Sequence, residues 1–122
     1  MSISIEIFKG ENGRCLIELK GRLDTHTYPQ LEAALAGLDG KEYSLQILDM
    51  KNLDYISSAG LRCIFKARKV AVAAGAEFFL VNLQAQVQKV LDIIKALPPH
   101  EIFASNLELD HYLHKIQKQT LS

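Results

Sequence analysis

The chain has 122 residues, of which 48% are hydrophobic and 23% are charged, so its composition is that of one ordinary globular domain. Fourteen lysines and arginines balance fourteen aspartates and glutamates, and this zero net charge argues against a protein that binds nucleic acid through bulk positive charge. No apolar run approaches the ~20 residues of a membrane-spanning helix. No secretion signal is visible at the N-terminus, so we expect a cytoplasmic protein that forms a single domain over residues 1–122.

The first two elements are predicted to form a β-hairpin. Hydrophobic residues occupy every second position of segment 3–7, which is typical of a strand with one buried face. The same alternation returns over residues 14–19, after a turn that contains Asn12-Gly13. Residues 21–24, Gly-Arg-Leu-Asp, are predicted to be a loop.

Helical and strand patterns alternate after the hairpin. Thr27 and Pro29 mark the start of a helix whose apolar residues repeat at helical spacing up to Leu38. Residues 45–48 are short and mostly apolar, as in a strand that is buried on both faces. Residues 49–56 are expected to form a connection with turn character.

The second half of the chain continues this alternation. A helix is predicted from about Ser58 to Ala74, a strand at 78–81, and a third helix that ends before Pro98-Pro99. A short edge strand at 102–103 and a last helix capped by Ser105 and Glu108 complete the pattern. The order predicts an α/β fold, with a mixed sheet of four to five strands covered by about four helices.

The most informative segment joins the third strand to the second long helix and reads Asp54-Tyr55-Ile56-Ser57-Ser58-Ala59-Gly60-Leu61. Serine is a preferred N-cap because its oxygen accepts a hydrogen bond from a free backbone N–H, so capping explains one of the two serines. The small residues around the second serine are expected to leave the helix start open to an approaching molecule. A helix N-terminus also favours an attached phosphate, so a serine here is either a cap or a phosphoacceptor.

This segment resembles the signature of the STAS domain, as found in bacterial anti-sigma-factor antagonists, and the loop Gly21-Arg22-Leu23-Asp24 resembles the family's Gly-x-Leu-Asp. The resemblance implies a STAS-like fold along nearly the whole chain. It matches Ser58 to the serine that a partner kinase phosphorylates. Ala59 stands where the family has Ser or Thr, and Ser57 stands on a position often held by Asp, so Ser57 competes with Ser58 as the phosphoacceptor.

The resemblance implies a binding module rather than an enzyme. Such a protein binds an anti-sigma factor with a serine kinase fold, is released when Ser58 is phosphorylated, and is reset by a PP2C-type, metal-dependent phosphatase. From the residues we expect no cofactor and no metal site, and the resemblance implies a monomer or weak dimer. The expected partner-binding residues are Asp24, Ser57, Ser58, Ala59, Gly60, Arg62 and Lys66. Arg62 and Lys66 share one face of the predicted helix and would attract an acidic partner, while Phe65 and Val72 are expected on the core side.

Two other hypotheses remain open. The chain could be a constitutive adaptor subunit of a transport or signalling complex, in which case the serines only cap the helix. It could also be an enzyme that groups Ser58 with His26 and Asp24, because a nucleophile needs a base and an orienting group. Cys15 and Cys63 are far apart in the sequence and are expected to be reduced core thiols. The phosphorylation hypothesis itself requires a serine hydroxyl that another macromolecule can reach.

Overall fold

The computed structural model of the chain describes residues 2–96, 114, 115, 117 and 118. Its elements in chain order are β1 (Ile3–Lys9), β2 (Arg14–Leu23), α1 (Tyr28–Ala36), β3 (Leu45–Ile56), α2 (Ser58–Ala73), β4 (Glu77–Val81) and α3 (Ala85–Ala96). The four described C-terminal residues are helical as well. The predicted edge strand at 102–103 and the capping pair Ser105 and Glu108 lie outside the described residues. Within the described ranges, no helix is long and apolar enough to cross a bilayer.

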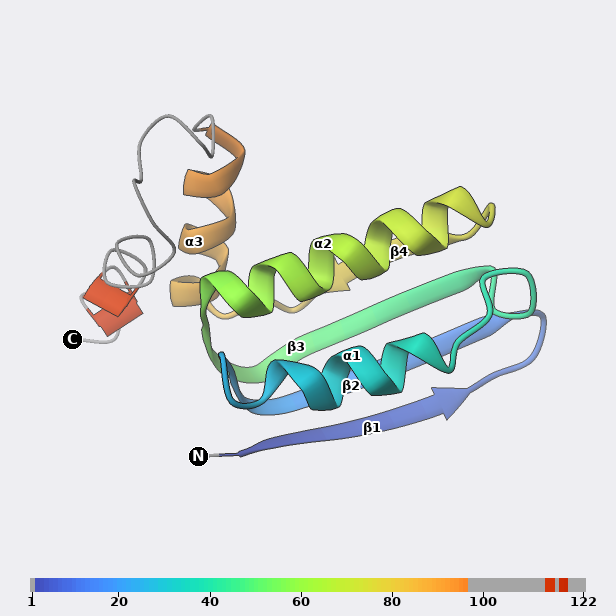
Figure 1. Cartoon of the computed structure of the whole chain (residues 1–122), viewed down its shortest axis with the longest axis horizontal. Coiled ribbons are helices and arrows are strands. Elements are labelled where there is room, and N and C mark those ends of the chain that lie inside the picture. Colours follow the sequence, from blue (N-terminus) through green and yellow to red (C-terminus); the bar gives the residue numbers. More distant parts are fainter. Residues whose placement is uncertain (1, 97–113, 116, 119–122) are drawn as a thin grey trace.

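The described strands form one mixed sheet in the order β1-β2-β3-β4. β1 is antiparallel to β2 through the predicted hairpin, whereas β3 runs parallel to both β2 and β4. Helices α1 and α2 pack against each other and lie on the same side of the sheet (Figure 1), and α3 lies beyond the carboxyl end of β3. The predicted α/β fold with parallel crossovers is therefore confirmed, with four strands and three helices among the elements named above.

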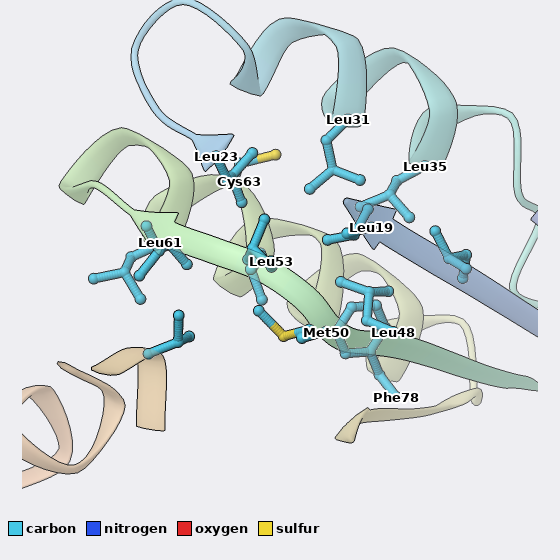
Figure 2. Packing of buried hydrophobic residues seen from close by; sticks show 14 of the residues in the cluster. Leu19, Leu23, Leu31, Leu35, Leu48, Met50, Leu53, Leu61, Cys63 and Phe78 are labelled. Atoms are coloured by element: carbon cyan, nitrogen blue, oxygen red, sulfur yellow. The ribbon is translucent and has the colours of Figure 1, made fainter. Parts of the chain in front are cut away.

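The hydrophobic core lies between the sheet and the two helices α1 and α2. Figure 2 shows its side chains converging from both layers. β2 contributes Leu19 and Leu23, α1 contributes Leu31 and Leu35, β3 contributes Leu48, Met50 and Leu53, α2 contributes Leu61 and Cys63, and β4 contributes Phe78. Alternation along β2 buries Cys15, Ile17 and Leu19, as the sequence pattern predicts.

Two strands are longer than predicted. β2 continues through the expected loop to Leu23, and β3 continues through the expected connection at 49–56 to Ile56. The two extensions pair with each other, with register shifts that interrupt the ladder after Glu18 and after Gly21. Such bulges add residues to one strand and interrupt the alternation of buried and exposed side chains. Exposed polar residues of β3 such as Lys51 therefore resemble a turn in the sequence.

Helix α2 has nearly the predicted bounds, but a narrower stripe of it is buried. Ile64 and Ala71 are buried, whereas 40% of Phe65 and 51% of Val72 are exposed, so the prediction that these two face the core is wrong. The stripe that faces the sheet starts at Gly60 and passes through Ile64 and Ala71, at the spacing of one helix face. Phe65 and Val72 follow this stripe by one residue each, which turns them about 100° away from the core.

The start of α2 lies directly against the end of β2. The backbone N–H of Ser57 donates a hydrogen bond to the carbonyl oxygen of Leu23 at 2.9 Å. A Cβ atom added to Gly60 would lie 2.7 Å from Cγ of Leu23 and 2.9 Å from its carbonyl oxygen. Only glycine permits this approach, because any side chain at position 60 would collide with the β2 backbone.

We therefore predict that Gly60→Ala lowers the free energy of unfolding by about 1–3 kcal/mol, as other overpacked buried sites do. The matched control is Gly37→Ala at the end of α1, where the nearest atom to a new Cβ is the Ala34 oxygen at 3.6 Å. That control should change stability by less than about 1 kcal/mol. Denaturant unfolding followed by circular dichroism measures both, and equal stability of the two variants would contradict the close contact.

Candidate functional site

The predicted site lies where β3 ends and α2 begins. Ser57 has an extended backbone, and its Oγ accepts a hydrogen bond from the N–H of Gly60 at 3.2 Å. This is the N-cap that the sequence predicts for one of the two serines. Ser58 is the first residue of the helix, and its hydroxyl oxygen does not make this cap. The two serines therefore have different positions relative to the helix, which the sequence alone did not separate.

Both serines are buried. Only 4% of Ser57 and 3% of Ser58 are exposed, and Ala59 is 9% exposed. The expectation that small residues leave the helix start open is wrong, because Leu23 fills the space beside Gly60. A macromolecule reaches either hydroxyl only after the side chains around the start of α2 have moved.

Asp24 lies in the tight loop between β2 and α1. Its Oδ1 accepts hydrogen bonds from the backbone N–H groups of His26 at 2.9 Å and Thr27 at 3.1 Å. The hydroxyl of Thr27 donates to the carbonyl oxygen of Arg22 at 2.7 Å and accepts from the N–H of Asp24, so Thr27 holds this loop together and makes no side-chain cap of α1. The loop directly follows Leu23, which places Asp24 beside the start of α2.

The geometry of this loop does not support the enzyme hypothesis. An acid that orients a catalytic base accepts a hydrogen bond from the imidazole ring. Here the Asp24 carboxylate accepts from the backbone of His26, whose side chain is exposed.

Three of the expected partner-binding residues lie in one surface hollow. Ala59, Arg62 and Lys66 line a depression of about 170 Å³ together with Tyr28 and Glu32 of α1. The depression continues into a groove of about 350 Å³ between α1 and α2, since both are lined by Glu32, Cys63 and Lys66. Arg62 and Lys66 are exposed, as predicted, whereas the contribution of α1 was missed because no motif marks it.

Both cysteines are free and buried. Burial, with a further contribution from Glu32, raises the pKa of the Cys63 thiol to about 11, although Lys66 acts in the opposite direction. The Cys63 thiol is therefore protonated near neutral pH and is a poor nucleophile, in line with a thiol that packs rather than reacts.

An arginine that the sequence analysis did not single out lies beside the site. The guanidinium of Arg22 is 3.9 Å from the centre of the Tyr55 ring, and its Nε is 3.7 Å from Oδ2 of Asp24. Tyr55 also contacts His114 in the C-terminal helical segment, with the ring centres 5.6 Å apart in an edge-to-face arrangement. Arg22 therefore brings a positive charge to the same end of the sheet as the two serines.

Glutamine side chains bind the end of β3 where β4 no longer pairs with it. β4 pairs with β3 only from Leu45 to Asp49. Beyond that point, the side-chain amide of Gln84 donates to the backbone carbonyl oxygen of Lys51 at 2.7 Å. The side-chain amide of Gln86 donates to the backbone carbonyl oxygen of Asp54 at 3.2 Å. These amides replace part of the backbone ladder that a longer β4 would provide.

Gln117 completes this replacement from the C-terminal segment. Its amide accepts a hydrogen bond from the N–H of Ile56 and donates one to the carbonyl oxygen of Ile56, both at 2.9 Å. Only 1% of Gln117 is exposed. The sequence offered no signal for this contact, because glutamine is usually a surface residue and position 117 is 61 residues away from Ile56. Gln117 therefore holds the backbone of Ile56, the residue that directly precedes the two serines.

We predict that Gln117→Leu lowers the free energy of unfolding by about 2–4 kcal/mol, because it leaves two buried backbone groups of Ile56 without partners. Gln88→Leu is the matched control, since Gln88 is exposed and its side-chain amide donates to Asp92, one turn further along the same helix. Thermal and denaturant unfolding of both variants measure the difference. A loss no larger than that of the control would show that this contact does not stabilise the end of β3.

The sequence matches the STAS domain family over residues 5–108. One relative, a putative anti-sigma factor antagonist BtrV from Bordetella bronchiseptica, is 35% identical over 82 residues, which are 67% of this chain and 71% of that protein. Another, an anti-sigma F factor antagonist from Paenibacillus polymyxa, is 25% identical over 105 residues, which are 83% of this chain and 89% of that protein.

The fold has close counterparts among solved structures. The anti-sigma factor antagonist SpoIIAA in its unphosphorylated form superimposes with a TM-score of 0.62 at 18% identity, over 91% of this chain and 98% of SpoIIAA. The crystal structure of Mglu gives a TM-score of 0.56 at 20% identity, over 67% of this chain, and this chain spans 20% of the Mglu chain. Because the STAS domain family matches most of its sequence, the chain belongs to the STAS domain family.

Proposed function

We propose that this protein is an anti-sigma factor antagonist, which acts by binding an anti-sigma factor of serine kinase fold around the start of α2. The names of its relatives from Bordetella bronchiseptica and Paenibacillus polymyxa support this role. The observation that carries the proposal is the meeting of three features at one end of the sheet. These are the serine pair at the α2 start, the Asp24 loop beside it, and the hollow lined by Arg62 and Lys66.

Ser58 is the proposed phosphoacceptor, because it matches the serine that is phosphorylated in the family, whereas the Ser57 hydroxyl caps the helix. A phosphate on Ser58 adds about −1.5 to −2 charges at the first residue of α2, where helix N–H groups favour a negative charge. A tenfold to hundredfold change in affinity needs only ~1.4–2.8 kcal/mol. One modification at the start of α2, beside the proposed binding surface, is large enough to supply that change.

The burial of Ser58 adds a condition to this mechanism. A kinase must act on a state in which the start of α2 has opened, because Ser58 is only 3% exposed and a kinase active site cannot reach its hydroxyl. A phosphate cannot return to the buried position of the hydroxyl without losing its hydration. The modified protein would therefore keep a changed arrangement around Leu23 and Gly60, and the docking surface would no longer fit the kinase. A PP2C-type phosphatase would restore the original surface.

A constitutive adaptor is the second candidate function, and the burial of both serine hydroxyls favours it. In that case the serines have only structural roles and the surface around Arg62 and Lys66 binds its partner permanently. Such a complex would survive treatment with a phosphatase.

The two candidates differ in what they predict for Ser58 variants. If Ser58 is the switch, incubation with the cognate serine kinase and Mg-ATP adds one phosphate, and Ser58→Ala abolishes the addition. Ser58→Asp should weaken binding of that kinase at least tenfold, whereas Ser58→Ala should preserve it. Isothermal titration calorimetry measures the affinities, and mass spectrometry of proteolytic fragments locates the phosphate.

Ser44→Asp is the control, because it adds the same charge at an exposed serine before β3. It should leave kinase binding unchanged. Phosphate on neither Ser57 nor Ser58, together with a stable complex that Ser58→Asp does not weaken, would overturn the switch and leave the adaptor.

A further inference from the structure

The sheet has a second face, opposite to α1 and α2, that the proposed function does not use. In β2 the residues Cys15, Ile17 and Leu19 point toward the core, so the residues between them point to the other face. Both α1 and α2 lie on the core side of the sheet (Figure 1). We call the other side the open face.

An apolar row crosses the open face at right angles to the strands. It consists of Phe8, Leu16, Ile47 and Phe79, one residue from each strand in the order β1 to β4. Each is the direct cross-strand partner of the next, so their side chains stand side by side. Phe8 is 48% exposed and Phe79 is 49% exposed, although both are large and aromatic.

An acidic row runs parallel to the apolar row, two residues further along the sheet. Glu6 of β1 stands directly opposite Glu18 of β2, and Glu18 is the partner of Asp49 in β3. Like charges in directly opposed positions are destabilising by up to ~1 kcal/mol. The ion pair found in the described part of the chain is Arg22 with Asp24, so neither Glu6 nor Glu18 has a cation within salt-bridge distance there.

The other neighbours of the acidic row are hydrogen-bond donors to Asp49 and two cations that form no ion pair with it in the described chain. Oδ1 of Asp49 accepts hydrogen bonds from the backbone of Lys51 and from the amide of Asn82. By strand alternation, Arg14 and Lys20 also belong to the open face, two residues from Leu16 and from Glu18, respectively. The middle of the open face therefore has an apolar row whose two aromatic ends, Phe8 and Phe79, are exposed. Along one side of this row lie Glu6 and Glu18, which lack a cation within salt-bridge distance in the described chain, whereas Asp49 is buried.

We propose that the open face binds a basic amphipathic helix of a partner protein, with its apolar stripe on the apolar row and its lysines or arginines over Glu6 and Glu18. Four strands at ~4.8 Å spacing make the row about 14 Å long, which equals roughly ten residues of α-helix. The acidic row lies about 7 Å away along the strands, at the flank of a helix that is about 10 Å wide. Apolar contact and charge complementarity thus select the same partner.

Other occupants fit less well. An anionic membrane surface would be repelled by the acidic row. A second copy of this chain would bring a second acidic row rather than the cations that the first one lacks. The open face is on the opposite side of the sheet from α2, so this inference is independent of the proposed switch at Ser58.

The test uses two designed helical peptides of about 14 residues. Both have a leucine stripe; one has lysines along its flank and the other has glutamates at the same positions. Fluorescence anisotropy should show the lysine peptide binding at least tenfold more tightly than the glutamate peptide. Exchanging Glu6 and Glu18 together for lysine should reverse this preference.

The double variant Phe8→Thr/Phe79→Thr should weaken binding of the lysine peptide at least tenfold, because threonine keeps the strands but removes the aromatic surface. Val72→Thr is the matched control, since Val72 is 51% exposed on α2 and lies outside the open face. Circular dichroism melting checks that each variant is folded. Ser58→Asp should leave peptide affinity unchanged, which separates this inference from the proposed function.

Three results would overturn the proposal. The first is that the two peptides bind equally or that neither binds. The second is a dimer in sedimentation experiments that the phenylalanine variants dissociate, which would identify a second copy as the occupant. The third is binding to phosphatidylglycerol vesicles that these same variants abolish, which would identify a lipid surface.

Discussion

The contact between Leu23 and the first turn of α2 determines the geometry of this end of the molecule. The carbonyl oxygen of Leu23 accepts a hydrogen bond from the N–H of Ser57, and Leu23 occupies the space that any side chain at position 60 would need. The contact brings the Asp24 loop, the end of β3 and the start of α2 within one small region. It also explains why both serine hydroxyls are buried, since the helix cannot approach β2 this closely and leave its first turn exposed.

Glutamine side chains solve a second problem that this arrangement creates. To reach Leu23, β3 must continue well beyond the last residue that pairs with β4, which leaves backbone groups without a neighbouring strand. Buried backbone groups need hydrogen-bond partners. Gln84, Gln86 and Gln117 supply them from segments that are distant in the sequence. The start of α2 is thus held from the β2 side by backbone contacts and from the other side by amides.

The sheet separates two surfaces with different chemistry. On the helix side, Arg62 and Lys66 place positive charge around the hollow beside α1. On the open face, Glu6 and Glu18 place negative charge beside exposed aromatic rings. The two proposed binding surfaces do not overlap, because they lie on opposite sides of the sheet (Figure 1).

Local patterns determined the order of elements, the hairpin, the parallel crossovers and the bounds of α2, because these depend on hydrophobic periodicity and on residues such as Gly75, whose φ is +87°. The same patterns placed the serine pair at a helix start and Arg62 and Lys66 on its exposed face. Tertiary structure decided the rest. β2 and β3 paired with each other beyond their predicted ends, Leu23 packed against Gly60 at the helix start, and Gln117 bonded the backbone of Ile56. These features depend on contacts between residues tens of positions apart, and neither the period nor the propensity of a segment carries information about what packs against it.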